Sequence, residues 1–259
     1  MKIKDIVRAL ESFAPLPLQE DYDNAGLQTG LPEAEVSGAL LCLDVTESVV
    51  EEAVEQGCGI VVSHHPVMFR PLRHLTDSSQ PERIVRMALK NDVAIYSAHT
   101  NLDNARGGVN FEMACRLGLQ DVDFLQRHTD ESGSGVTGML PEPEEAAAFL
   151  KRVKDMFGVE CLMHNELLQR SIRKVALCGG AGDFLLKEAL AWGADAFLTG
   201  EMHYHVYFGQ EQQIQIATLG HYESEQFTQH LLKSILEKAL PELKVRITQQ
   251  KTNPVYYLK

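Results

Sequence analysis

Short runs of apolar residues alternate with amphipathic stretches along most of the chain. The continuous Ala, Leu, Val and Ile runs at 39–43, 59–62 and 93–98 are typical of strands in a parallel sheet covered on both faces. Between the first two runs, residues 46–56 have the period of a helix. This order of strand, helix and strand predicts an α/β fold.

The same pattern returns in the second half of the chain. Cys42 aligns with Cys178, and the alignment continues without a gap to the pair His65 and Glu201. Any two units of this kind share a hydrophobic template, so an internal duplication and a merely similar architecture both explain the match. Both interpretations predict the same local geometry at the strand ends.

The remaining segments complete a second domain and the C-terminus. Residues 121–173 are more polar and include a charged stretch, 141–155, that predicts a helix with Pro at its start. The tail predicts a helix at 225–239 and a strand at 243–247. Its apolar ending, 254–258, suits either a last edge strand or packing on a partner.

Composition narrows the class of protein. A chain of 259 residues can bury a core without help from disulfides. The five cysteines show no C-x-x-C spacing and mostly lie in apolar runs, which favours a reducing compartment. The start mixes charge into a helical period, and no apolar stretch approaches the ~20 residues of a membrane span, so we expect a cytoplasmic protein without a membrane segment.

Charge bears on the choice of partner. The formal net charge of -12 disfavours nucleic acid as a partner, because nonspecific affinity for it comes chiefly from clustered Lys and Arg. The net charge does not exclude a local basic patch that forms only on oligomerisation.

Polar clusters follow the predicted strands at four places, and these are the strongest lead to function. Two of them share the pattern His-x-x-x-acid, His99 to Asp103 and His221 to Glu225. The other two are the sequence Ser-His-His-Pro at 63–66 and Thr-Gly-Glu at 199–201. The loops at the carboxyl ends of parallel strands form the ligand crevice of such sheets, so we expect all four clusters to lie there.

Imidazole and carboxylate groups without cysteine suit a divalent ion that binds a water molecule for catalysis. A single catalytic Zn²⁺ takes three protein ligands, so a set of five fits two ions. Taken singly, each cluster also has an ordinary explanation, as a polar strand end or a surface pair one helical turn apart. The five candidate ligands are His64, His65, Asp103, His221 and Glu225.

Two further residues are candidates for proton transfer or support. Glu201 suits a general base near a metal-bound water. His99 suits a residue that orients a ligand or shares a proton, although a structural histidine explains it nearly as well. A glycine-rich stretch at 179–182 lies between a strand and a helix, where it either cradles a phosphate or allows close packing.

Six motifs in order resemble one family over nearly the whole chain. They are Asp-Asn-Ala-Gly-Leu at 23–27, Ser-His-His-Pro at 63–66, His-Thr-Asn-Leu-Asp at 99–103, Gly-Gly-Val-Asn at 107–110, Thr-Gly-Glu at 199–201 and Gly-His through Glu at 220–225. They are similar to the NGG-one-interacting-factor-three-like proteins, the GTP cyclohydrolase I type 2 homologues, in the short form without an inserted domain. Tyr222 stands where some relatives have a second His.

The resemblance implies two intertwined three-layer α/β/α domains with mostly parallel or mixed sheets. We expect the first at 1–125, with 220–259 packing on it, and the second at 126–219. It also implies a toroidal homohexamer and a site for two divalent ions on the five ligands named above. Mixed His and carboxylate ligands accept Zn, Fe, Mn, Co or Ni.

Two functions from different classes follow from these observations. The first is a metal-dependent hydrolase or cyclohydrolase that acts on a nucleotide or a related small molecule. The alternative is a noncatalytic metal-binding or adaptor ring protein. Measured turnover on a nucleotide panel would separate them.

Overall fold

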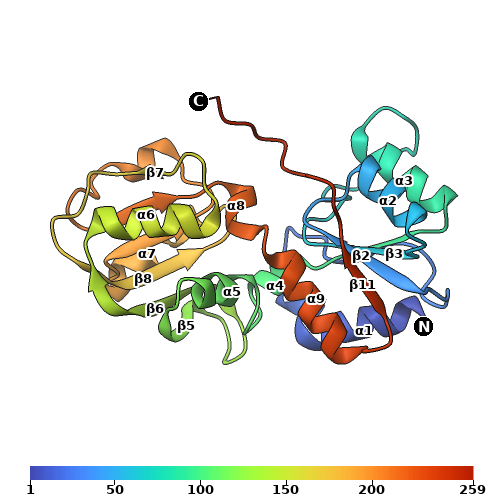
Figure 1. The fold of residues 1–259 in the computed structure, drawn as a ribbon, viewed down its shortest axis with the longest axis horizontal. Helices are drawn as coiled ribbons and strands as arrows, with labels where there is room; N and C mark the ends of the chain where they lie inside the picture. Colours follow the sequence, from blue (N-terminus) through green and yellow to red (C-terminus); the bar gives the residue numbers. More distant parts are fainter. Residues whose placement is uncertain (259) are drawn as a thin grey trace. The chain divides into compact units, whose positions relative to one another are not determined.

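The computed structural model describes residues 1–258, which form two compact units (Figure 1). Unit 1 comprises Met1–Leu102 and Thr228–Pro254, and unit 2 comprises Asp103–Phe227 and the residues from Val255 onward. The chain thus leaves unit 1 and returns to it. The expected boundary at residue 125 falls within strand β5, whereas the units divide at Leu102.

Unit 1 is built on a five-stranded sheet with the order β1-β4-β3-β2-β11. The strands β4, β3, β2 and β11 are parallel, and β1 runs antiparallel to β4 at the edge. The central strands are buried along their whole length, as the continuous apolar runs predict. The strands are β1 (Gly26–Thr29), β2 (Gly38–Cys42), β3 (Ile60–Ser63), β4 (Ala94–Ser97) and β11 (Lys244–Ile247).

Helices cover both faces of this sheet and give unit 1 three layers (Figure 1). One face packs Leu40 and Val61 against α2 (Glu47–Glu55) and α3 (Gln80–Lys90). Because side chains alternate along a strand, the residues between them face α9 on the opposite side. The second helix pair is α1 (Ile3–Phe13) and α9 (Thr228–Ala239), and two short elements, η1 (Leu16–Leu18) and α4 (Thr100–Asp103), lie in loops.

Unit 2 contains a six-stranded mixed sheet with the order β5-β6-β8-β9-β10-β7. One face packs against α5 and α6, and the other packs against α7, so unit 2 also has three layers. The strands are β5 (Gln120–Arg127), β6 (Gly133–Glu144), β7 (Met163–His164), β8 (Ile172–Cys178), β9 (Ala196–Thr199) and β10 (Gln215–Thr218). The helices are α5 (Val109–Arg116), α6 (Ala146–Phe157), η2 (Asp183–Leu185), α7 (Leu186–Trp192), η3 (Tyr204–Tyr207) and α8 (His221–Glu225).

The two sheets share the order of four strands. β1-β4-β3-β2 in unit 1 corresponds to β7-β10-β9-β8 in unit 2, with an antiparallel edge strand followed by three parallel strands in each. They differ at the next position, where β11 is parallel to β2 but β6 is antiparallel to β8. The expected α/β fold is confirmed, and the shared order fits both a duplication and a merely similar architecture.

Several predicted boundaries differ from the structure. The helix expected at 141–155 begins at Ala146, because β6 continues through Glu144 before the chain turns. The helix expected at 225–239 is α9, which begins at Thr228 because a separate short helix, α8, ends at Glu225. Residues 254–258 form no strand in the described chain. Among the described residues, no helix has both the length and the apolar character that crossing a bilayer requires.

Candidate metal centre

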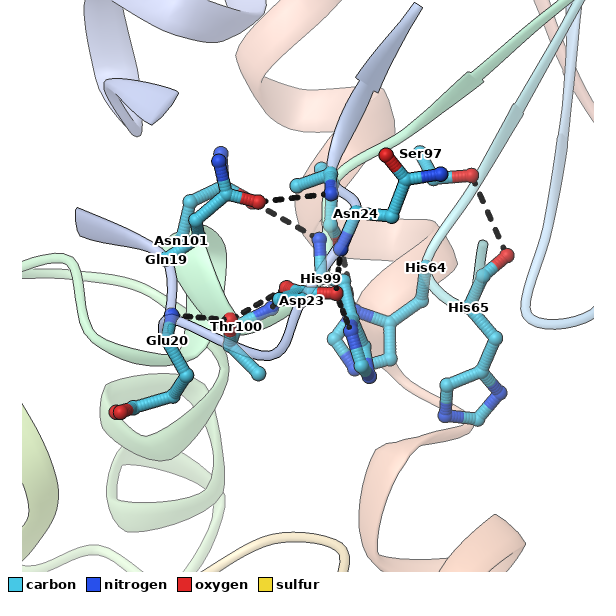
Figure 2. Close-up of polar contacts among 12 residues, drawn as sticks. Gln19, Glu20, Asp23, Asn24, His64, His65, Ser97, His99, Thr100 and Asn101 are labelled. Carbon is cyan, nitrogen blue, oxygen red and sulfur yellow. Dashed lines mark hydrogen bonds and ion pairs between the residues drawn. The ribbon is translucent and has the colours of Figure 1, made fainter. Parts of the chain in front are cut away.

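His64 and His65 follow β3 directly, where the backbone holds them firmly. The His64 and His65 amides both donate to the Leu43 carbonyl, at 3.2 and 3.0 Å. The Ser63 hydroxyl donates to the His65 carbonyl at 2.8 Å, and the Ser97 hydroxyl donates to it at 3.3 Å (Figure 2). Pro66 lacks an amide proton and ends the strand pattern. The turn that carries both imidazoles is therefore fixed by hydrogen bonds from two neighbouring strands.

His99 joins this pair, and all three rings bind an oxygen through the same nitrogen. Nδ1 of His64 lies 2.7 Å from the carbonyl oxygen of Ala98. Nδ1 of His65 lies 2.7 Å from Asp44 Oδ1, and Nδ1 of His99 lies 2.7 Å from Asp23 Oδ1. A carbonyl oxygen can only accept, so the proton of neutral His64 is on Nδ1. Nδ1 protonation leaves Nε2 as the nitrogen that can bind a metal.

The three rings form one compact group, called here the histidine cluster (His64, His65 and His99). A nitrogen of each ring lies within 4.8 Å of a nitrogen of each of the others. The ring centroids are 4.9 to 5.5 Å apart. His64 is fully buried, and the side chains of His65 and His99 are only 22% and 16% exposed. A site that fixes three imidazoles in this way fits a divalent ion of the Zn, Fe, Co or Ni type.

Asp23 orients His99 and anchors the loop before β1. Its carboxylate accepts hydrogen bonds from the Thr100 amide at 3.0 Å and from the Thr100 hydroxyl, as well as from His99 (Figure 2). Burial of this carboxylate opposes its ionisation, but the hydrogen bonds from His99 and Thr100 outweigh burial and lower the pKa of Asp23 to about 2. Asp23 is therefore ionised at neutral pH and holds His99 by a charge-assisted hydrogen bond.

Asp44 plays the same part for His65. Its second oxygen accepts a hydrogen bond from Thr252 at 3.1 Å, so the C-terminal segment of unit 1 supports the carboxylate. The sequence analysis did not single out Asp44. The available signal was its position directly after the buried run 39–43, the same place relative to β2 that His65 occupies relative to β3.

Unit 2 has its own group of imidazole and carboxylate side chains, called here the unit 2 cluster (Glu201, His221 and Glu225). His221 and Glu225 lie one turn apart on α8, with His221 Nε2 3.1 Å from Glu225 Oε2. Nδ1 of His221 lies 2.8 Å from Glu201 Oε1, which follows β9. The Glu225 side chain is 5% exposed, whereas those of His221 and Glu201 are 39% and 58% exposed. The unit 2 cluster is thus more open than the histidine cluster.

Asp103 is the first residue of unit 2 and is tied to the glycine-rich stretch through Asn110. The Asn110 amide donates to the Asp103 carbonyl at 3.1 Å, and its oxygen accepts from the Gly179 amide at 2.9 Å. Asn110 lies in α5, which begins at Val109. One side chain therefore links a candidate ligand to the loop that supports Glu225.

That loop, residues 179–182, serves close packing. The Gly180 and Gly182 amides donate to the hydroxyls of Ser224 and Thr199, each at 3.0 Å, so they are committed within the protein. Gly180 has φ +58°, and a Cβ atom there would lie 2.5 Å from Glu225 Oε1. Of the two interpretations left open by the sequence, the packing of the loop against Glu225 is the one that the hydrogen bonds support.

Six of the seven predicted site residues, all except Asp103, thus belong to the two clusters defined above, each within one unit. Unit 1 brings together His64, His65 and His99, and unit 2 brings together Glu201, His221 and Glu225. Glu201 forms a hydrogen bond with His221 that orients the His221 ring. His99 forms a hydrogen bond with Asp23 that orients the His99 ring. Chemically, the arrangement offers neutral imidazoles and carboxylates, which are the ligands of divalent ions that activate water.

Comparisons with known proteins identify the family of the chain. A family model described as Duf34/NIF3 (NGG1p interacting factor 3) matches residues 1–254. A Lactococcus lactis protein named GTP cyclohydrolase 1 type 2 homolog is 34% identical over 263 residues, which cover 99% of both chains. A Clostridium perfringens protein of the same name is 33% identical over 228 residues, covering 87% of both chains.

A solved structure shares the fold. The crystal structure of a Bacillus cereus protein related to NIF3 superimposes with a TM-score of 0.90 at 24% identity, covering 100% of this chain and 99% of that one. At this identity the likeness concerns the fold alone.

Proposed function

The chain belongs to the Duf34/NIF3 family, and we propose that it is a metal-dependent hydrolase acting on a nucleotide or a related small molecule. The ligands assigned by the proposal are His64, His65, Asp103, His221 and Glu225, which hold two divalent ions. The observation that carries it is the shared orientation of three imidazoles, each with Nδ1 bound to an oxygen. Catalytic and structural metal sites alike orient their histidines in this way.

The number of ions follows from ligand chemistry. A catalytic zinc ion takes three protein ligands and keeps a position for water, so five ligands exceed the need of one ion. Bound divalent ions lower the pKa of their water and polarise a carbonyl or phosphoryl oxygen. The printed names of the relatives agree with hydrolytic chemistry on a nucleotide, since they refer to GTP cyclohydrolase.

The protein's own side chains then have distinct roles. Asp44 and Asp23 hold the rings of His65 and His99, and the Ala98 carbonyl holds that of His64. Glu201 orients His221 and, being exposed, is placed to accept a proton from the substrate side. The proposal keeps His99 as the neighbour that moves or holds a proton, with Asp23 as its partner.

Metal analysis and turnover test this proposal together. Elemental analysis of the purified protein is expected to give two ions per chain, and release of formate or phosphate from a nucleotide panel is expected to require them. His64→Ala and Glu225→Ala should abolish both properties, whereas Cys161→Ala, an exposed change outside both clusters, should preserve them. Retained turnover in the first two variants would exclude these ligands as the catalytic site.

The noncatalytic alternative has a distinct signature in the same experiment. Two bound ions without turnover on any nucleotide would indicate metal binding alone. The homohexamer stays a prediction of the family resemblance, and the mass of the assembly in solution tests it. The cytoplasmic location stays a prediction from the sequence.

A further inference from the structure

An exposed pair of aromatic rings borders the histidine cluster within unit 1. Tyr22 and Phe69 lie with ring centroids 6.3 Å apart at 63°, and their side chains are on residues that are 66% and 45% exposed. Phe69 also meets the His99 ring edge-on, at 6.1 Å and 87°. Single exposed aromatic residues are ordinary on protein surfaces, but two in contact beside a buried polar cluster indicate a binding surface.

Hydrogen bonds of the Asp23 and Asn24 side chains anchor the chain next to each ring. Asp23, next to Tyr22, is fixed by His99 and Thr100. The Asn24 amide donates to the Met68 carbonyl at 2.7 Å, immediately before Phe69 (Figure 2 shows Asn24 and Asp23). Two loops distant in sequence are therefore tied together, and they present the two rings in a fixed arrangement.

We propose that Tyr22 and Phe69 form the ring-binding subsite of this centre, where the planar heterocycle of the substrate stacks. This inference rests on the proposed function, because it names the part of the substrate that the site recognises. The rings are inclined to each other, so one offers its face and the other its edge, and both geometries are favourable for an aromatic ligand. The contact of Phe69 with His99 places the bound ring next to the histidine cluster.

Charge favours a substrate with an anionic substituent on the Phe69 side. Arg70 follows Phe69 and is exposed, in a chain whose net charge is -12. Glu20 and Asp21 precede Tyr22, and they disfavour an anion on that side. A heterocycle carrying phosphate or carboxylate is thus recognised by stacking at its ring and by an arginine at its substituent.

Binding of guanosine to Zn²⁺-loaded protein, measured by calorimetry, tests the subsite. Phe69→Leu and Tyr22→Leu are expected to weaken guanosine binding about tenfold each, because each removes one aromatic ring against which the base stacks. Tyr22→Phe keeps the ring and should bind like the wild type. Phe184→Leu, which removes a phenyl ring that is 59% exposed in unit 2, is the matched control and should also leave binding unchanged.

Ribose 5-phosphate has no aromatic base to stack, so it should bind equally to the wild type and to the Tyr22 and Phe69 variants. Arg70→Gln should weaken the binding of GTP more than the binding of guanosine. Undetectable guanosine binding to the wild type, or equal affinity in Phe69→Leu, would overturn the inference. The metal content of each protein distinguishes failure of this inference from failure of the proposed function. A wild-type protein that binds no ions contradicts the proposed function. Variants with the wild-type metal content and the wild-type guanosine affinity contradict the subsite alone.

Discussion

The histidine cluster and the unit 2 cluster use the same chemistry with different degrees of enclosure. In unit 1 the three rings are largely buried and are held by a carbonyl and two carboxylates. In unit 2 His221 is held by Glu201, a carboxylate that is itself 58% exposed. Buried hydrogen bonds persist in a low dielectric, while exposed ones compete with water. Unit 1 therefore holds its three rings firmly, whereas in unit 2 His221 and Glu201 are open to water although Glu225 is buried.

Loss of one ligand from each cluster should give the largest effect. We expect His64→Ala and His221→Ala each to lower metal-dependent turnover by more than about 100-fold, beyond the 10- to 100-fold typical for loss of an orienting partner. Steady-state kinetics with metal in excess measures this. A large loss in only one of the two variants would show that a single cluster serves the reaction.

Substitution of the orienting carboxylates should separate the two clusters. Asp44→Asn is expected to weaken metal affinity about 10- to 100-fold, because His65 loses a charged partner. Glu201→Gln should cost less than about tenfold, since its pair with His221 is open to water. Metal titration with a competing chelator measures both affinities. Equal losses would contradict the contrast in enclosure.

The packing of the glycine-rich loop against Glu225 gives a smaller, local effect. Gly180→Ala forces a methyl group toward Glu225 Oε1 at a left-handed backbone position, and we expect a loss of about 1–2 kcal/mol in the free energy of unfolding, with weaker metal binding. Gly158→Ala is the matched control, because its φ of +64° is similar but no atom lies within 4 Å. Urea unfolding and metal titration of both variants check this. Identical metal affinities would remove the role assigned to the loop.

The smallest effect concerns Tyr96, a fully buried side chain on β4. Burial raises the pKa of Tyr96, with Glu11 adding to the shift, and among the described residues the Tyr96 hydroxyl has no hydrogen-bond partner. The unfolded tyrosine ionises near pH 10 while the folded one stays neutral. Stability therefore falls above that pH, by up to about 1.4 kcal/mol per pH unit for this group.

Tyr96→Phe should accordingly leave the free energy of unfolding nearly unchanged at pH 8. Between pH 10 and 11.5 the variant should lose less stability than the wild type. Urea unfolding of both proteins followed by circular dichroism across this range measures the difference. Parallel curves would mean that water reaches the Tyr96 hydroxyl and that unit 1 is less enclosed than its burial indicates.

The strands and the groups at their ends were predictable from sequence, because apolar runs and the polar residues that follow them are local features. Val93 to Ala98 and the His-x-x-x-acid pattern after it identify β4 and its end without tertiary knowledge. The partners of these residues were not predictable in the same way. Asp44 and Asp23 reach His65 and His99 from distant strands and loops, and only the folded sheet brings them together.

Element boundaries were predicted wrongly where a strand continues into residues whose sequence pattern favours a helix. The charged stretch from 141 reads as a helix, yet the pairing of β6 with β8 extends the strand as far as Glu144. The division between the two units at Leu102 has no composition change in the sequence to mark it. Tyr22 and Phe69 also carry no pattern in the sequence, because their significance depends on a ring contact between two loops.

Anomalous diffraction from crystals of the metal-loaded protein tests the central claim most directly. The proposal predicts two peaks per chain, about 3.5–4 Å apart, with His64 and His65 among the ligands together with His221 and Glu225. A single peak bound only by the histidine cluster, or separate peaks each confined to one unit, would contradict it.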